Sequence, residues 1–292
     1  MHIGDFDFVL PKKLIAQKPK KPRSLSKIIV QNNPKIIFFK NLYNYLPKNS
    51  LLVFNNTKVI PTILEGHTDL KKIKVTLYEK LKSNNWKVFL KPGKKAKSGS
   101  TINFEKGLSG IIHKTQNYNY IKFNISDEKL ENYLYRHAEF PIPPYIKTIR
   151  NKVEDEQNYQ TIFAEKRGAY AAPTAGLHFD KELMKNLKQN DIDTAYITLH
   201  VGAGTFLPLK NEIIENNILH YERGIISRTN ANKINQAIKN DRTIIAVGTT
   251  VVRLLEGCYK KYRKIKHFNE NTNIFIYPGF KFNVVDSLIT NF

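Results

Sequence analysis

Apolar residues follow two different spacings in the second half of the chain. Between residues 195 and 201 every second side chain is apolar, and this alternation predicts a strand. Between residues 231 and 238 the apolar positions repeat at helical spacing, with Thr229 or Asn230 as the candidate N-cap. The same patterns predict three more elements: a strand at 243–247, a helix at 251–262 and a strand at 273–277. Strands that alternate with helices indicate an α/β layer with at least partly parallel pairing.

The middle of the chain carries short alternating runs separated by turn residues such as Pro92-Gly93. Several short strands with tight turns favour a small barrel or sandwich. Five such strands fit the pattern, at 73–77, 86–90, 101–104, 109–113 and 118–125.

These two patterns divide the chain into an α/β domain and an all-β insertion. We place the inserted domain at residues 62–150, where the proline-rich run 141–144 suits an extended exit. The α/β domain then uses residues 1–61 and 151–292. The predicted fold is a mixed α/β domain with an inserted small all-β, barrel-like domain.

Composition is typical of a globular protein and excludes several kinds of site. With 292 residues, 41% of them hydrophobic, the chain can bury a substantial core. No apolar run approaches the about 20 residues that cross a bilayer. The N-terminus lacks an apolar signal core, so we expect a cytoplasmic protein, and we take it to be a monomer. Cys258 is the only cysteine, which excludes an intrachain disulfide, and no Cys/His cluster has the spacing of a metal site.

The net charge of +22 favours a polyanionic partner such as nucleic acid. Lysine spread evenly over a solvated surface is the alternative, because the chain is also rich in Asn and Ile. One candidate RNA-binding cluster surrounds the Pro-Gly turn of the barrel-like domain: Lys91, Lys94, Lys95 and Lys97. Such lysines would contact phosphates and make affinity depend on salt, without selecting a base sequence.

Three runs combine glycine, hydroxyl and imidazole groups in a mixture that ordinary core strands do not need: Ala171–Phe179, Thr198–Phe206 and Ala246–Glu256. Together with Asp5–Phe8, Leu51–Pro61, Pro141–Ile146 and Tyr159–Ala164, they resemble the S-adenosylmethionine:tRNA ribosyltransferase-isomerases of queuosine biosynthesis.

The resemblance implies an α/β domain joined to a small β-barrel, and an unusual reaction. Members of the family transfer the ribosyl part of S-adenosylmethionine to the aminomethyl group of a 7-deazaguanine at the tRNA wobble position. The sugar isomerises to give epoxyqueuosine, and adenine and methionine are released. S-Adenosylmethionine is then a consumed substrate, no cofactor is expected, and the partner is tRNA carrying the deazaguanine precursor. This chemistry needs a base, an acid, hydrogen-bond donors for developing negative charge, and exclusion of water.

His178 and His200 are the best acid–base candidates, because imidazole titrates near neutral pH. The sequence leaves open which is the acid and which the base, and whether either only binds substrate. Glu222 is the third catalytic candidate. It lies in a His-x-Glu element that resembles the family's, where it would act as a base or orient His220.

The turn that holds Thr174 and Gly176 precedes a helix that we expect to begin near Asp180. Backbone amides at a helix start favour anions, so we expect this turn to bind the methionine carboxylate or a tRNA phosphate. A simple strand-to-helix connection is the alternative.

Six further substrate-binding candidates come from the other two runs: Gly202, Gly204, Thr205, Thr249, Thr250 and Arg253. The glycines would let a purine or ribose approach the backbone closely. The threonine hydroxyls either bind a ribose or the target base, or cap the following helix. The arginine either pairs with a carboxylate or phosphate, or is a solvated surface residue.

The chain departs from the family pattern in three places. Asn56 stands where the family commonly has aspartate, Asn217 stands where it usually has histidine, and Phe292 ends the chain earlier than family members end. Since the resemblance implies that the family's segment beyond this point contributes both core and catalytic groups, we expect reduced stability and weak or absent transferase activity. Two alternatives are a shortened, inactive relative that acts as a basic RNA-binding protein, and an ordinary S-adenosylmethionine methyltransferase; the absence of an early glycine-rich loop argues against the methyltransferase.

Overall fold

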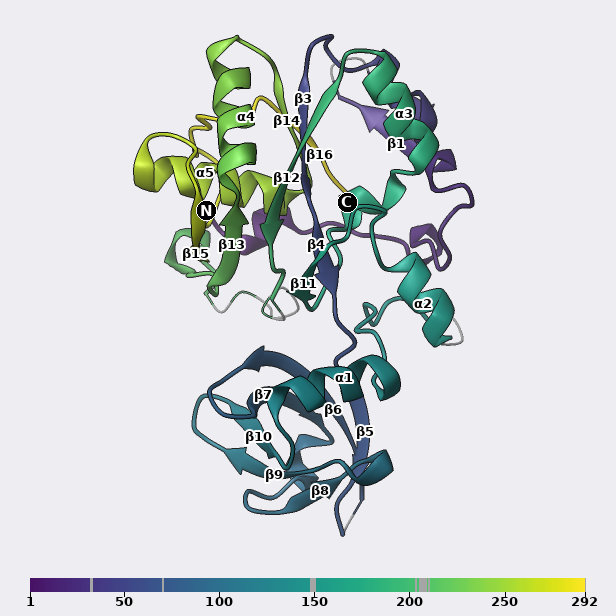
Figure 1. Ribbon diagram of the computed structural model, residues 1–292, viewed down its shortest axis with the longest axis vertical. Coiled ribbons are helices and arrows are strands. Elements are labelled where there is room, and N and C mark those ends of the chain that lie inside the picture. Colours follow the sequence, from purple (N-terminus) through teal and green to yellow (C-terminus); the bar gives the residue numbers. More distant parts are fainter. Residues whose placement is uncertain are drawn as a thin grey trace. The chain divides into compact units, whose positions relative to one another are not determined.

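The computed structural model describes residues 1–31, 34–69, 71–147, 151–202, 204, 209 and 211–291 (Figure 1). The chain forms two compact units. The first comprises Met1–Lys58, Pro144–Ile149 and Gln157–Phe292, and the second comprises Val59–Pro143 and Arg150–Glu156.

A mixed six-stranded sheet forms the centre of the first unit, in the order β15-β13-β12-β3-β14-β16. Strands β12, β3, β14 and β16 run parallel, whereas β13 and β15 continue the sheet as antiparallel strands. The carboxyl ends of the four parallel strands therefore share one edge with the start of β13. The strands are β3 (Leu51–Asn55), β12 (Asp193–Leu199), β13 (Glu222–Ile226), β14 (Ile244–Val247), β15 (Phe268–Thr272) and β16 (Ser287–Ile289).

Helical segments cover both faces of this sheet. On β3, Leu51 and Val53 belong to one core, while Leu52 and Phe54 belong to the other, and all four are fully buried. Burial on both faces explains why this parallel strand is apolar at successive positions. The first core includes α4 (Arg228–Lys239) and α5 (Thr249–Tyr262), and the second includes α3 (Lys181–Gln189) and the 3₁₀ segment η4 (Phe39–Asn44).

Shorter elements complete the description. Strands β1 (Lys27–Val30) and β2 (Lys35–Phe38) form a hairpin, β4 (Thr57–Val59) pairs with β11 (Lys166–Ala169), and α2 spans Lys152–Asn158. The remaining 3₁₀ segments of the first unit are η1 (Ile3–Phe6), η2 (Lys12–Leu14), η3 (Arg23–Leu25), η7 (Thr174–His178) and η9 (Ile214–Asn216).

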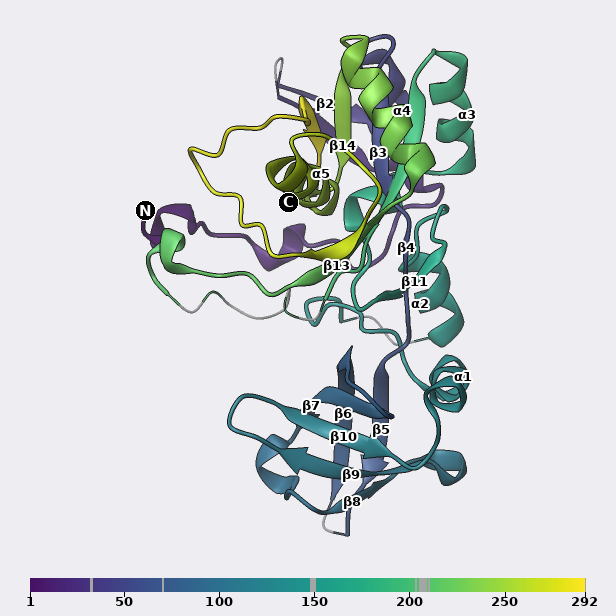
Figure 2. The ribbon, with the colours of Figure 1, turned by 60° about the vertical axis from the view of Figure 1, so that its left-hand side comes forward.

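The second unit is a closed antiparallel barrel in the order β10-β7-β6-β5-β8-β9 (Figure 2). Its strands alternate buried and more exposed residues, so that one side of each strand fills the interior. The strands are β5 (Ile63–His67), β6 (Lys72–Lys80), β7 (Asn85–Lys91), β8 (Thr101–Asn103), β9 (Ser109–Lys114) and β10 (Asn119–Phe123). Helix α1 (Asp127–His137) follows β10, and two 3₁₀ segments, η5 (Gly93–Lys95) and η6 (Glu105–Gly107), lie between strands.

The predicted fold class, mixed α/β with a barrel-like all-β part, is confirmed. The predicted strand at 273–277 is wrong, because the strand there is β15 and ends at Thr272. This edge strand, Phe268–Thr272, is largely polar and gives little apolar signal. Strands β1 to β5, β11 and β13 and helices α1 and α2 were not predicted.

The N-cap of α4 is Ser227 rather than Thr229 or Asn230, because the Ser227 side chain accepts a hydrogen bond from the Asn230 amide. Replacement of Ser227 by alanine should lower the free energy of unfolding by about 1 kcal/mol, since that amide loses its acceptor. Thr229→Ala should change stability by less than about 0.5 kcal/mol. Urea unfolding of both variants checks this, and equal losses would contradict the assignment of the cap.

Candidate active site

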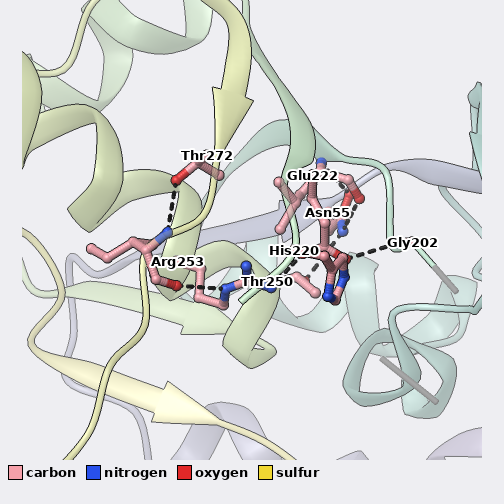
Figure 3. A network of polar contacts seen from close by, with 9 residues as sticks. Asn55, Gly202, His220, Glu222, Thr250, Arg253 and Thr272 are labelled. Atoms are coloured by element: carbon pink, nitrogen blue, oxygen red, sulfur yellow. Dashed lines mark hydrogen bonds and ion pairs between the residues drawn. The ribbon is translucent and has the colours of Figure 1, made fainter. Parts of the chain in front are cut away.

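The side chain of Asn55 connects three elements at the carboxyl edge of the sheet. Asn55 ends β3 and is 1% exposed. Its amide nitrogen donates to the carbonyl oxygen of Leu199 at 2.9 Å and to Thr250 Oγ1 at 3.2 Å. Its amide oxygen accepts from the backbone nitrogens of Leu199 at 3.0 Å and Thr57 at 3.1 Å. The end of β12, the start of β4 and the first turn of α5 are therefore held by one buried amide. Figure 3 shows Asn55 and Thr250 together with the polar contacts around Glu222.

His200 directly follows β12, and its backbone nitrogen donates to the carbonyl oxygen of Arg223 at 3.0 Å. On its ring, Nδ1 lies 2.8 Å from Thr57 Oγ1. A Cβ at Gly168, whose φ is +141°, would lie 3.0 Å from the imidazole, so the ring packs against glycine backbone. Burial lowers the pKa of His200, and the nearby charge of Arg223 lowers it further. The imidazole is therefore neutral near pH 7.

Glu222 has a completely buried side chain at the start of β13. One carboxylate oxygen accepts from the Gly202 amide at 2.8 Å and lies 3.3 Å from Nε2 of His220. The other oxygen pairs with Nη1 of Arg253. Burial by itself raises the pKa of Glu222, but His220, Arg253 and the Gly202 amide together hold that pKa below its ordinary value. Glu222 is therefore an ionised carboxylate that holds its neighbours in place, and its lowered pKa makes it a weak base.

Arg253 is a structural partner of the site and not a solvated surface residue. From α5, its Nε donates to the carbonyl oxygen of Ile274 at 3.2 Å, in addition to the ion pair with Glu222. Its Nη2 is buried and has no hydrogen-bond partner among the described residues. The guanidinium thus retains one unused donor.

The glycine turn after His200 packs around the imidazole of His220. A Cβ at Gly202 would lie 3.3 Å from His220 Cδ2, and a Cβ at Gly204 would overlap the ring. Glycine is therefore required here for close approach to a side chain of the protein itself. Thr205, the third candidate of this turn, lies outside the described residues.

Thr249 and Thr250 are the first two residues of α5, and neither is its N-cap. Gly248 is the N-cap, without a side-chain capping bond, so neither threonine caps the helix. The Thr250 hydroxyl accepts the bond from Asn55, while Thr249 is exposed. The Gly248 amide donates to the carbonyl oxygen of Ile289 at 2.8 Å, which places the end of β16 beside this turn.

The run that contains His178 reaches the same edge of the sheet. A Cβ at Gly248 would lie 3.7 Å from the Cβ of Ala175, in η7. The ring nitrogen Nε2 of His178 lies 2.9 Å from Oδ1 of Asn291. Burial lowers the pKa of His178, and the charge of Arg23 adds to this, while the Asn291 bond opposes it. His178 is therefore also neutral near pH 7.

Helix α3 offers little support for an anion site at Thr174 and Gly176. Its N-cap is Asp180, as expected, and the Asp180 carboxylate already accepts from the backbone nitrogens of Leu183 at 2.9 Å and Ser24 at 3.2 Å. Thr174 and Gly176 lie in η7, before that cap. A Cβ at Gly176 would lie 2.9 Å from the Phe163 ring, so a larger side chain there is expected to disturb packing.

The two asparagines that depart from the family pattern are both engaged. Asn56 donates to Glu165 at 3.0 Å and accepts from the Thr198 hydroxyl at 2.6 Å. Asn217 donates to the carbonyl oxygens of Asn211 and Ile213, both at 2.9 Å, and so holds a loop.

Sequence reasoning missed the roles of Asn55 and Thr57, although both lie in a run that resembles the family.

The candidate RNA-binding lysines belong to the barrel and not to the unit that holds the site just described. Lys91, Lys94 and Lys97 are exposed, while the side chain of Lys95 lies outside the described residues. The turn beside them is fixed by Lys114, whose Nζ donates to the carbonyl oxygen of Gly93 at 2.8 Å.

The three runs supply imidazoles, hydroxyls and glycine backbone to one edge of the sheet. The carboxyl edge of parallel strands is the usual ligand crevice of α/β proteins. Within the described residues, no group of three or more His, Cys, Asp or Glu side chains is placed to hold a metal ion. Across that same part of the chain, no helix combines the length and apolarity needed to span a membrane.

Comparison with known proteins gives consistent results. The family described as "Queuosine biosynthesis protein" matches residues 3–292. The S-adenosylmethionine:tRNA ribosyltransferase-isomerase of Thermoanaerobacter sp. (strain X514) is 41% identical over 100% of this chain and 87% of its own length. The enzyme of the same name from Zymomonas mobilis is 38% identical over 100% of this chain and 86% of its own length. The crystal structure of S-adenosylmethionine tRNA ribosyltransferase from Thermotoga maritima matches with a TM-score of 0.50 and 28% identity, over 99% of this chain and 84% of that one.

Replacement of Asn55 by alanine should lower the free energy of unfolding by about 3 kcal/mol. Both backbone groups of Leu199 would lose a buried partner, at a cost of about 1–3 kcal/mol each. Asn271→Ala, an exposed strand position, is the control and should cost less than about 0.5 kcal/mol. Chemical denaturation measures both, and similar losses would show that Asn55 does not hold the site together.

Stability should fall as the pH drops below 6.5, the ordinary pKa of histidine. The pKa values of His178 and His200 are lowered in the folded protein, so the unfolded chain binds protons first, and stability is complete only above that pH. The double variant His178→Asn/His200→Asn should therefore lose less stability than the wild type between about pH 7.5 and about pH 5.5. Thermal unfolding at several pH values measures this, and an equal pH dependence in the double variant and the wild type would contradict the prediction.

Proposed function

The chain belongs to the queuosine biosynthesis protein family, and from this we propose that it is an S-adenosylmethionine:tRNA ribosyltransferase-isomerase acting on tRNA. In the proposed reaction, the ribosyl part of S-adenosylmethionine is transferred to 7-aminomethyl-7-deazaguanine at the wobble position and isomerised. The products are epoxyqueuosine in tRNA, free adenine and free methionine. The tRNA substrate implies a cytoplasmic location.

One observation carries this proposal. The backbone of Leu199 and the hydroxyl of Thr250 are bonded to the same Asn55 side chain, and Gly248 lies beside Ala175. The three chemically unusual runs therefore meet at the carboxyl edge of β3, β12 and β14, where α/β sheets bind ligands. A single substrate placed there can reach groups from all three runs.

We assign His200 as the general base. Its Nδ1 is occupied by Thr57 Oγ1 at 2.8 Å, which leaves Nε2 as the nitrogen that faces substrate. Its lowered pKa keeps the imidazole neutral and able to accept the acidic proton of the ribose carbon next to the sulfonium. His178, also neutral and at the same edge, is the second acid–base candidate.

Glu222 supports this chemistry without taking a proton. It is bonded to the Gly202 amide and paired with Arg253, so it fixes the turn containing Gly202 and Gly204 relative to α5. We propose that this turn and the hydroxyls of Thr249, Thr250 and Thr205 receive the nucleoside. Phosphates of the tRNA would be held by Lys91, Lys94, Lys95 and Lys97.

Incubation of the protein with S-adenosylmethionine and tRNA carrying the deazaguanine precursor should release adenine and methionine, and mass spectrometry of the tRNA should show epoxyqueuosine. This turnover would overturn the weak or absent activity expected from the sequence, and its absence would overturn the proposed reaction. His200→Ala should reduce kcat by about 10²–10⁴-fold, because the base is removed. His137→Ala, an exposed histidine of α1, should leave kcat unchanged.

Other products would contradict the proposal in distinct ways. Formation of S-adenosylhomocysteine would indicate methyl transfer. Binding of tRNA without consumption of S-adenosylmethionine would indicate a non-catalytic RNA-binding protein.

A further inference from the structure

The outer surface of the barrel carries a row of aromatic side chains that the chemistry above does not use. We call it the aromatic row and define it as Tyr78 on β6, Phe89 on β7, His113 on β9, Tyr118 before β10, and Tyr120 on β10. None of the five is among the buried residues, and Phe89 is 37% exposed.

Strand register makes one half of the row continuous. Tyr120 lies opposite Lys87 of β7 on one side and opposite His113 of β9 on the other. The rings of Tyr120 and His113 are stacked, with centroids 4.6 Å apart and an interplanar angle of 9°. Tyr118 lies beside Tyr120, with ring centroids 6.2 Å apart.

The other half of the row is a second stacked pair. The rings of Tyr78 and Phe89 have centroids 4.3 Å apart and an interplanar angle of 19°. Lys87 contacts the first half, since its Nζ is 4.6 Å from the centre of the Tyr118 ring, and it precedes Phe89 by two residues on β7. The pKa of Tyr78 is raised by burial, and Glu79 and Tyr118 add to this, which agrees with the two halves being neighbours.

The barrel core does not need these rings. The interior of the same strands is filled by fully buried side chains: Ile73, Val75, Leu77, Val88, Ile112 and Ile121. Cross-strand aromatic pairs stabilise a sheet. The five rings of the row are only partly buried, so ring edges and outer ring faces remain exposed to water. Exposing apolar ring surface to water is unfavourable.

Charge indicates what this surface would bind. Residues 59–143 contain fifteen Lys and Arg against eight Asp and Glu. Lys74 and Lys91, opposite each other on β6 and β7, and Lys122 on β10 are exposed on the strands that carry the row. Aromatic rings among lysines suit unpaired nucleotides, whose bases stack while their phosphates contact the cations.

We propose that the aromatic row binds unpaired bases of an RNA loop by stacking. The proposal rests on the tRNA-modifying function and extends it, since unpaired bases in loops are the parts of RNA that proteins recognise by stacking. Stacking accepts any base, so this surface would supply affinity and position, and the site at the sheet edge would select the modified base.

Direct binding measurements test the proposal without depending on turnover. The probe is an anticodon stem-loop RNA with 4-thiouridine in the loop, followed by fluorescence anisotropy and by photocrosslinking mapped with mass spectrometry. Tyr120→Leu, which keeps apolar bulk but removes the ring face, should weaken binding about tenfold. His113→Ala should also weaken it, and crosslinks should map to Tyr118 or Tyr120.

The chain offers a matched control. His137 on α1 contacts a tyrosine in the same way, with its ring centroid 4.5 Å from that of Tyr133, but it is not part of the row. His137→Ala should leave RNA affinity unchanged. Equal affinity of Tyr120→Leu and wild type, or an equal loss in His113→Ala and His137→Ala, would overturn the proposal.

The same variants separate this proposal from the function itself. If wild type consumes S-adenosylmethionine with precursor tRNA, Tyr120→Leu should raise the KM for tRNA with kcat unchanged, and an unchanged KM would overturn the stacking role. If wild type consumes no S-adenosylmethionine but Tyr120→Leu still loses RNA affinity, the proposed reaction fails and the RNA-binding surface stands.

Discussion

At the end of β3, the side chain of Asn55 makes the hydrogen bonds to β12 that strand backbone would otherwise make. The amide of Asn55 bonds both the backbone nitrogen and the carbonyl oxygen of Leu199, as an adjacent strand would, and it also holds Thr250 and the backbone of Thr57. Strand β12 ends at Leu199, and His200 is the first residue after it. Because Thr57 also contacts the His200 ring, one buried amide sets the position of the imidazole relative to α5.

The ionisable groups of the site are of two kinds: a charged pair and two neutral imidazoles. Glu222 and Arg253 form a buried ion pair, and removal of one partner from such a pair leaves an uncompensated charge. The two imidazoles, by contrast, are kept neutral by burial and by nearby arginines, Arg223 for His200 and Arg23 for His178. A strongly basic chain thereby holds two neutral imidazoles at the same edge of the sheet as its buried carboxylate.

The two units carry different physical properties. The sheet unit holds buried polar groups with defined partners, which suits chemistry on one small substrate. The barrel holds exposed lysines and stacked aromatic rings, which suit contact with a polyanion that has exposed bases. The net charge of +22 agrees with such a partner, while the stacked pairs give the more specific indication.

The sequence alone was sufficient to predict the fold class and the family, and to single out the three runs that approach one another. Apolar periodicity and unusual local composition can be read from neighbouring residues, so no tertiary contact is needed for these predictions. It placed Asp180 as the cap of α3 but failed at β15, since an edge strand needs little apolar character. Only the tertiary structure decided that Arg253 pairs with Glu222, that the glycine turn wraps the His220 ring, and that Asn55 joins β12 to α5. These contacts join residues 31 to 195 positions apart or depend on ring packing, so no spacing along the chain encodes them.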